Sequence, residues 1–256
     1  IRYPEAAGTY LGTILYDRTN PILTINEADA NTWYANYTVN YEIKSGDTNI
    51  ESPLAGAGYV ITGTSESKDE SIPLDGTQKA ATGDIVIPES DNVAGTNLAF
   101  TAKDASENVM PSYGYSVKVD KTKPTVDLKV GGKKILSNPL EGDVKITADV
   151  WDNLTIRTAT ITVKGPDTDI TKSLCGEIEQ VNIKKSRSMV LDTLIGKHAA
   201  DGDYTVTVKV ADKAGNTDEQ TVSFRVDNTI PVVTAKISGG ETAGKKPGKS
   251  FDGTIC

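Results

Sequence analysis

The sequence has few of the residues that build enzyme active sites. It contains one histidine, His198, in a polar stretch with no serine on a recognisable nucleophile turn, so Ser-His-Asp chemistry has no support. The glycine pair at 131–132 is not followed by a helical pattern, which excludes a phosphate-binding loop there. We therefore expect a protein that is not an enzyme.

Cysteines are almost absent. Cys175 and Cys256 are too few and too unfavourably placed for a disulfide framework. We expect a structural thiol at Cys175 and an incidental one at Cys256, with a bridge between the two as the alternative. This scarcity also argues against a eukaryotic secreted receptor, whose sandwich domains often carry an inter-sheet disulfide.

Long apolar runs and basic stripes are missing too. No run approaches the roughly 20 apolar residues that span a bilayer, so no membrane insertion is expected within this sequence. The net charge is −8, with lysines and arginines scattered among acidic residues, which makes nucleic acid an unexpected partner. The chain begins and ends in mid-pattern and carries no sorting signal, as expected of a piece of a longer protein.

Apolar residues make up 37% of the chain, with only three Phe and two Trp. This is lean for one large core and suits two smaller sandwiches, each with a thin apolar layer between its sheets. Thr, Val, Ile, Tyr and Gly are frequent, and most of the chain reads as short strands separated by turns. The composition therefore predicts an all-β fold.

A short phrase, Asp-x-Thr-x-Pro, occurs three times, at 17–21, 120–124 and 227–231. Its prolines lie 103 and 107 residues apart, close to the size of one immunoglobulin-type sandwich. Asp and Thr cap turns, while Pro holds the chain extended, so each copy predicts a short and stiff connector.

A hairpin pattern precedes the second and third copies of the phrase. Residues 204–210 alternate apolar and polar side chains, 212–216 form a turn, and 221–226 return. The same order recurs in weaker form over 98–119. Finding the same order twice supports a repeat of whole domains.

Residues 201–231, and less specifically 94–124, resemble the end of the bacterial Ig-like domains that are strung together in large adhesins and surface proteins. The resemblance implies seven-stranded sandwiches, surface exposure and a structural or adhesive role. Tyr204 resembles the tyrosine-corner residue, whose hydroxyl pins the loop before it. Thr96 stands at the corresponding place in the first repeat, where we expect that pin to be absent.

We therefore predict two tandem immunoglobulin-like β-sandwich domains, joined end to end by a short Pro-containing linker. The domains cover 17–122 and 123–229; residues 1–16 are interpreted as the remnant of a preceding domain, and 230–256 as the start of a following one or a tail. The expected strands are 22–26, 37–43, 58–63, 84–88, 97–103, 113–119, 125–130, 144–150, 159–163, 178–183, 188–192, 204–210 and 221–226, with one helical turn within 192–200.

Loop placement predicts a metal site in each domain. In such a sandwich, two loops and the incoming connector meet at one end, so their carboxylate and amide oxygens converge, and Ca²⁺ prefers oxygen ligands. The candidate ligands in the second domain are Asp120, Asp152, Asn153, Asp212 and Asn216, and those in the first are Asp17, Asp47, Asp104 and Asn108. The alternative is that these are ordinary turn residues, which need no metal.

Trp33, Tyr34 and Tyr37 form an aromatic cluster in the first domain. Exposed aromatic rings can stack on sugars, so this cluster is a candidate ligand site, with core and edge packing as the alternative.

The favoured function is a structural stalk or spacer of a bacterial cell-surface adhesin-type protein that presents a distal binding or catalytic module. The alternatives are a glycan- or protein-binding adhesion module and the accessory domains of a large secreted hydrolase. The expected location is extracellular, on the cell surface or secreted. Expected partners are flanking Ig-like domains of the same chain and a host protein or glycan.

Overall fold

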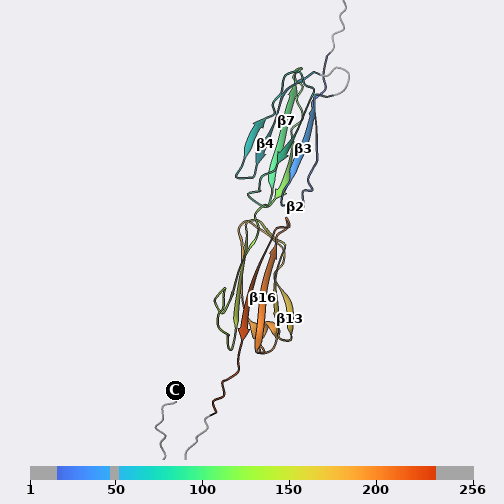
Figure 1. Cartoon of the computed structure of the whole chain (residues 1–256). Helices are drawn as coiled ribbons and strands as arrows, with labels where there is room; N and C mark the ends of the chain where they lie inside the picture. The colour runs from blue at the N-terminus through green and yellow to red at the C-terminus, as the bar shows by residue number, and fades with distance from the viewer. Residues whose placement is uncertain (1–15, 47–51, 235–256) are drawn as a thin grey trace, which may run out of the picture.

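The computed structural model describes residues 16–46 and 52–234, in which almost all regular structure is β-strand. The strands form two sandwich units that stand end to end, with the connector around Pro124 between them (Figure 1). Each unit has its own hydrophobic core, and the two cores share no residue. The predicted all-β, Ig-like fold class is confirmed. The predictions for 1–16 and 230–256 fall almost wholly outside the described residues.

The N-terminal unit packs a three-stranded sheet, in the order β1-β3-β6, against a five-stranded sheet, in the order β2-β8-β7-β4-β5. All neighbours are antiparallel except β2 and β8. The strands are β1 Ile22–Ile25, β2 Trp33–Tyr34, β3 Thr38–Lys44, β4 Leu54–Thr62, β5 Lys68–Ser71, β6 Ala80–Val86, β7 Thr96–Asp104 and β8 Tyr113–Val119.

The C-terminal unit repeats this plan with the sheets β15-β10-β9 and β13-β12-β16-β17, and a small ribbon of β11 and β14. One short helix, α1 Leu191–Ile195, follows β15. The strands are β9 Thr125–Val130, β10 Lys145–Asp152, β11 Thr155–Ile156, β12 Thr158–Gly165, β13 Thr168–Cys175, β14 Ile178–Glu179, β15 Ile183–Val190, β16 Gly202–Ala211 and β17 Thr217–Val226. No helix among the described residues is long and apolar enough to cross a membrane.

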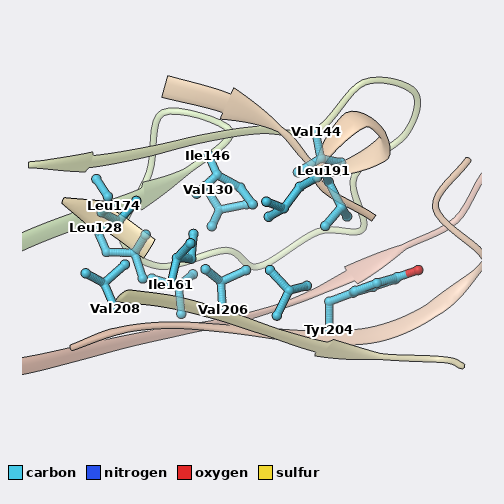
Figure 2. Close-up of a cluster of buried hydrophobic side chains, with 14 of the residues drawn as sticks. Leu128, Val130, Val144, Ile146, Ile161, Leu174, Leu191, Tyr204, Val206 and Val208 are labelled. Atoms are coloured by element: carbon cyan, nitrogen blue, oxygen red, sulfur yellow. The ribbon is translucent and has the colours of Figure 1, made fainter. Parts of the chain in front are cut away.

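The core of the C-terminal unit follows from the alternation along its strands. Val206 and Val208 on β16 are buried, whereas the intervening Thr207 remains partly exposed. They face Leu128 and Val130 of the opposite sheet (Figure 2). Each fully buried aliphatic side chain of this kind contributes about 1.5–3 kcal/mol, so the apolar faces of the two sheets stabilise their packing against each other.

The middle strands of the C-terminal unit differ from the two predicted at 178–183 and 188–192, of which the first is only the two-residue β14. The structure has β13 at Thr168–Cys175, where none was predicted, and β15 begins at Ile183 rather than at 188. Both are edge strands, and only the ends of β13 and the start of β15 are buried. Such polar edges carry no apolar alternation, so the sequence pattern does not reveal them.

Tyr204 closes one end of the C-terminal core. Its side chain is 1% exposed and its ring stacks on Phe224, with centroids 5.6 Å apart. Its hydroxyl is buried without a hydrogen-bond partner among the described residues, so the bond that defines a tyrosine corner is not seen there. In the N-terminal unit the corresponding Thr96 is also buried and donates a hydrogen bond to the carbonyl of Pro88 (3.3 Å). The N-terminal unit has no tyrosine at this place, as expected, and the Thr96 hydroxyl instead bonds the loop before β7.

The Tyr204 ring lies directly over Gly165, where a Cβ atom would overlap ring carbons. We expect Gly165→Ala to destabilise the C-terminal unit by about 1–3 kcal/mol, because the ring cannot retreat from a packed core. Gly176→Ala is the matched control, since nothing lies within 4 Å of its added Cβ. Urea unfolding of the two variants measures the difference, and equal midpoints would contradict this packing.

Candidate metal centre

Three aspartates from separate segments meet where the two units join. Asp120 follows β8 and starts the connector, Asp152 ends β10, and Asp212 follows β16. The three side chains are fully buried, and one ligand atom from each lies within 4.8 Å of the others. Among the described residues this is the one acidic or His/Cys group with such geometry. The structure therefore brings together three of the aspartates named from the sequence.

The hydrogen bonds of the triad leave two of its oxygens without donors. Asp152 Oδ1 accepts the backbone N–H groups of Leu154 (2.9 Å) and Thr155 (2.7 Å), and Asp120 Oδ2 accepts the Thr155 hydroxyl (3.2 Å). Asp120 Oδ1 and Asp152 Oδ2 are buried and have no partner among the described residues. A buried carboxylate oxygen without a donor costs free energy that a bound cation would recover.

Burial raises the pKa values of all three carboxyls, and repulsion between them adds to the rise at Asp120 and Asp152. Burial, with the nearby charges of Asp152 and Asp212, raises the pKa of Asp120 to about 8. Burial raises the pKa of Asp152 to about 6, against the effect of its backbone donors. The pKa of Asp212 is also raised, mainly by burial. No neighbouring lysine, arginine or histidine is among the causes of these three shifts.

These features fit a hard divalent cation. Asp120, Asp152 and Asp212 would hold the ion, and each offers carboxylate oxygen, the ligand type that Ca²⁺ prefers. The two oxygens without donors are the specific observation behind this fit. When bound, the ion would supply the positive charge that the cluster lacks.

Asn216, also named as a ligand from the sequence, braces the site. Its Nδ2 donates to the Asp120 carbonyl (2.9 Å) and to Asp212 Oδ2 (2.7 Å), and its N–H donates to Asp212 Oδ1 (2.7 Å). Asn153 points to Glu89 instead, donating from Nδ2 to Oε1 (2.9 Å). Asn216 thus ties the connector to the β16–β17 turn.

The N-terminal unit repeats this brace at its own far end. Asn108 Nδ2 donates to the Asp17 carbonyl (3.2 Å) and to Asp104 Oδ2 (2.8 Å). Asp17, however, accepts the N–H groups of Thr19 (3.0 Å) and Ser52 (2.8 Å), one on each oxygen. These donors, with Ser52 first, lower its pKa. Asp17 and Asp104 therefore carry donors on all four oxygens, unlike the triad, while Asp47 lies outside the described residues.

The side chains of the aromatic cluster Trp33, Tyr34 and Tyr37 are mainly packed against the rest of the N-terminal unit. Trp33 is 4% exposed, and the ammonium of Lys118 lies 5.5 Å from its ring centroid. A ring so enclosed has no free face for a sugar. Tyr34 and Tyr37 are partly exposed and tilted against each other, with centroids 4.7 Å apart. Both hydroxyls are engaged: Tyr37 donates to the Asn26 carbonyl, and Tyr34 accepts the Asp29 N–H.

Two further residues named from the sequence lie away from the joint. The His198 side chain is 99% exposed, and its Nδ1 lies 3.0 Å from Asp192 Oδ2. Cys175 is a free, partly buried thiol, and Cys256 lies outside the described residues.

Sequence reasoning did not find the residues that link the two units across the joint. Glu89 accepts the N–H of Thr122 (3.0 Å), and Glu179 pairs with both Lys118 (2.9 Å) and Lys213 (3.0 Å). They lie on loops and on a two-residue strand, in no repeated phrase. These two glutamates are recognised only from their contacts with residues that are distant in the sequence.

Residues 142–228 match the family model described as "Bacterial Ig-like domain". The C-terminal unit is therefore similar to bacterial Ig-like domains, which confirms the resemblance predicted from the sequence. The match does not extend to the N-terminal unit, so a tandem of two such domains stays a prediction. No curated protein matches the chain.

Among solved structures, the dimeric latent PorU of Porphyromonas gingivalis is similar at 13% identity, with a TM-score of 0.32. The match covers 83% of this chain and 24% of PorU. Red sea bream transglutaminase is similar at 10% identity and a TM-score of 0.28, over 82% of this chain and 32% of the enzyme. The chain thus spans about a quarter to a third of these proteins.

Proposed function

We propose that this chain is a spacer segment of a bacterial surface or secreted adhesin-type protein, and that a calcium ion stiffens the joint between its two units. Its partners in this role are neighbouring Ig-like domains of the same protein and a distal module that they hold away from the cell. The chain itself performs no catalysis in this proposal.

The observation that carries the proposal is the buried acidic triad at the joint. Asp120 belongs to the connector, whereas Asp152 and Asp212 belong to the C-terminal unit. An ion shared by these three would fix the connector against that unit and remove the repulsion between their charges. A spacer needs this kind of stiff connection between its units.

Direct contacts between the units support the same role. Glu179 of the C-terminal unit pairs with Lys118 at the end of the N-terminal unit, and both side chains are about three-quarters buried. Glu89 of the N-terminal unit accepts hydrogen bonds from Thr122 and Asn153. These contacts orient the two units while the ion would stiffen the connector.

Calcium is the best candidate among the hard cations. Ca²⁺ accepts 6–8 oxygen ligands in flexible geometry, and extracellular modules bind it with Kd values of about 10⁻⁴–10⁻³ M. Mg²⁺ demands near-octahedral geometry and gives up its water reluctantly, which suits a dry, buried triad less well.

Distance measurements between spin labels test the proposal. Cysteines at Ala80 and Ser188, both exposed and one in each unit, carry the labels after Cys175 and Cys256 are changed to serine. We expect Ca²⁺ to narrow the distance distribution, and Mg²⁺ at equal concentration to do so less. Asp152→Asn in the same background should remove the narrowing. Equal widths with Ca²⁺ and with chelator would refute a calcium-stiffened joint.

A further inference from the structure

The three copies of the Asp-x-Thr-x-Pro phrase differ in one hydrogen bond. In two of them the aspartate accepts the N–H of the threonine two residues later: Asp17 from Thr19 (3.0 Å) and Asp227 from Thr229 (3.1 Å). This closes a small turn in which the carboxylate caps its own backbone. The phrase by itself therefore favours an aspartate that is turned toward its own chain.

The copy between the two units breaks this pattern. The N–H of Thr122 donates to Glu89 Oε1 (3.0 Å) and not to Asp120. Glu89 belongs to the N-terminal unit, in the loop between β6 and β7, and the same oxygen also accepts Asn153 Nδ2 (2.9 Å). It therefore holds one residue on each side of the joint.

As a consequence, the Asp120 carboxylate accepts no hydrogen bond from the backbone of its own turn. Its only side-chain donor among the described residues is the Thr155 hydroxyl on Oδ2 (3.2 Å), and its Oδ1 has none. The carboxylate lies against Asp152 and Asp212 instead of closing over its own turn. Because the Thr122 N–H already donates to Glu89, it is not available as a donor to the Asp120 carboxylate.

We propose that Glu89 is a positioning residue that keeps Asp120 available as a cation ligand by taking the N–H of Thr122. The proposal rests on the cation site described above and deepens it: the N-terminal unit completes the site of the unit that follows it. Cation binding then depends on the single contact between Glu89 and the Thr122 N–H. Where no neighbouring carboxylate takes the threonine N–H, as at Asp17, the aspartate caps its own turn.

Calcium titration by calorimetry on the full chain tests this, with three variants. Glu89→Ala leaves the Thr122 N–H free for Asp120, and we expect Ca²⁺ binding to weaken about 10-fold or more, the usual effect of losing a residue that orients a metal ligand. Glu89→Gln keeps a carbonyl oxygen for that N–H and should stay within about 3-fold of wild type. Glu179→Ala removes the pairing with Lys118 across the same joint but leaves Thr122 untouched, so its affinity should match wild type.

The amide signal of Thr122 gives a second readout. In the metal-free protein, Glu89→Ala should move this NMR signal and Glu179→Ala should not, because only the former removes its acceptor. Equal affinities for wild type and Glu89→Ala overturn the inference alone. Equal weakening in Glu89→Ala and Glu179→Ala also overturns it, since the effect would then be general loosening of the joint. A wild-type chain that takes up no Ca²⁺ overturns the cation site and this inference with it.

Discussion

Calcium is expected to raise the melting temperature of the metal-free chain by about 10–20 °C, and Asp152→Asn is expected to abolish that rise. Saturating the site at about 100 times its Kd stabilises the folded state by about 2.7 kcal/mol. For a unit of this size, each kcal/mol shifts the melting temperature by about 4–8 °C. The ion would stabilise the fold because it binds only where connector and loops converge.

The same variant is expected to be more stable than wild type without metal at pH 8. The introduced asparagine would keep a carbonyl oxygen that accepts the Leu154 and Thr155 N–H groups. Its amide would stand where Asp152 Oδ2 has no donor, within the cluster that also holds Asp120. One negative charge would also leave the cluster. Loss of the calcium response together with a higher metal-free melting temperature is a result that simple damage to the fold does not produce.

Asp203→Asn is the matched control for this experiment. It removes one carboxylate from the same unit. The Asp203 side chain is 84% exposed and lies 3.8 Å from Arg225, at the start of β16, whereas Asp212 of the triad follows the opposite end of that strand. Its calcium response should equal that of wild type. A wild-type melting temperature that Ca²⁺ leaves unchanged would contradict the metal site.

Without metal, the chain is expected to lose stability as the pH rises from 5 to 8. The pKa of Asp120 is about 8 in the folded state, above its ordinary value of about 3.9 in an unfolded chain. Below the unfolded pKa, both states hold the proton and stability is complete. As the pH rises, the unfolded state releases its proton first, so stability falls until the pH passes the folded pKa. Asp152, with a pKa of about 6, adds to this fall in the lower part of the range.

The expected loss between pH 5 and pH 8 is on the order of 3 kcal/mol. Urea unfolding in chelator across this range measures it. Saturating Ca²⁺ should flatten the curve, because the cation replaces the protons that the cluster otherwise needs. Asp152→Asn in chelator should also show a smaller dependence, since one of the repelling charges is gone. A metal-free stability that rises with pH would contradict the assigned burial and repulsion.

The fold class and the triad followed from local patterns. The alternation over Tyr204–Val210 predicted a core strand because one face of a sandwich sheet is buried, and β16 lies there. Asp120, Asp152 and Asp212 were named because connector and turn residues of this fold meet at one end. The strand alternation and the turn and connector motifs each involve only a few neighbouring residues, so they can be recognised in the sequence.

Other features depend on contacts between residues far apart in the chain. The edge strands β13 and β15 are polar, and their places come from pairing with β12 and β10. Asp17 and Asp120 stand in the same phrase, yet one is saturated by backbone donors and the other is not.

By itself, the sequence determined where the strands of the core lie, the spacing of the repeat and which three aspartates meet at the joint. Only the tertiary structure decided which of those carboxylates are free. The reason is that Glu89 reaches Thr122 from 33 residues away, across the seam between two separately folded units. Which acceptor a backbone N–H bonds depends on which groups lie near it in the folded structure, and no pattern along the sequence predicts that.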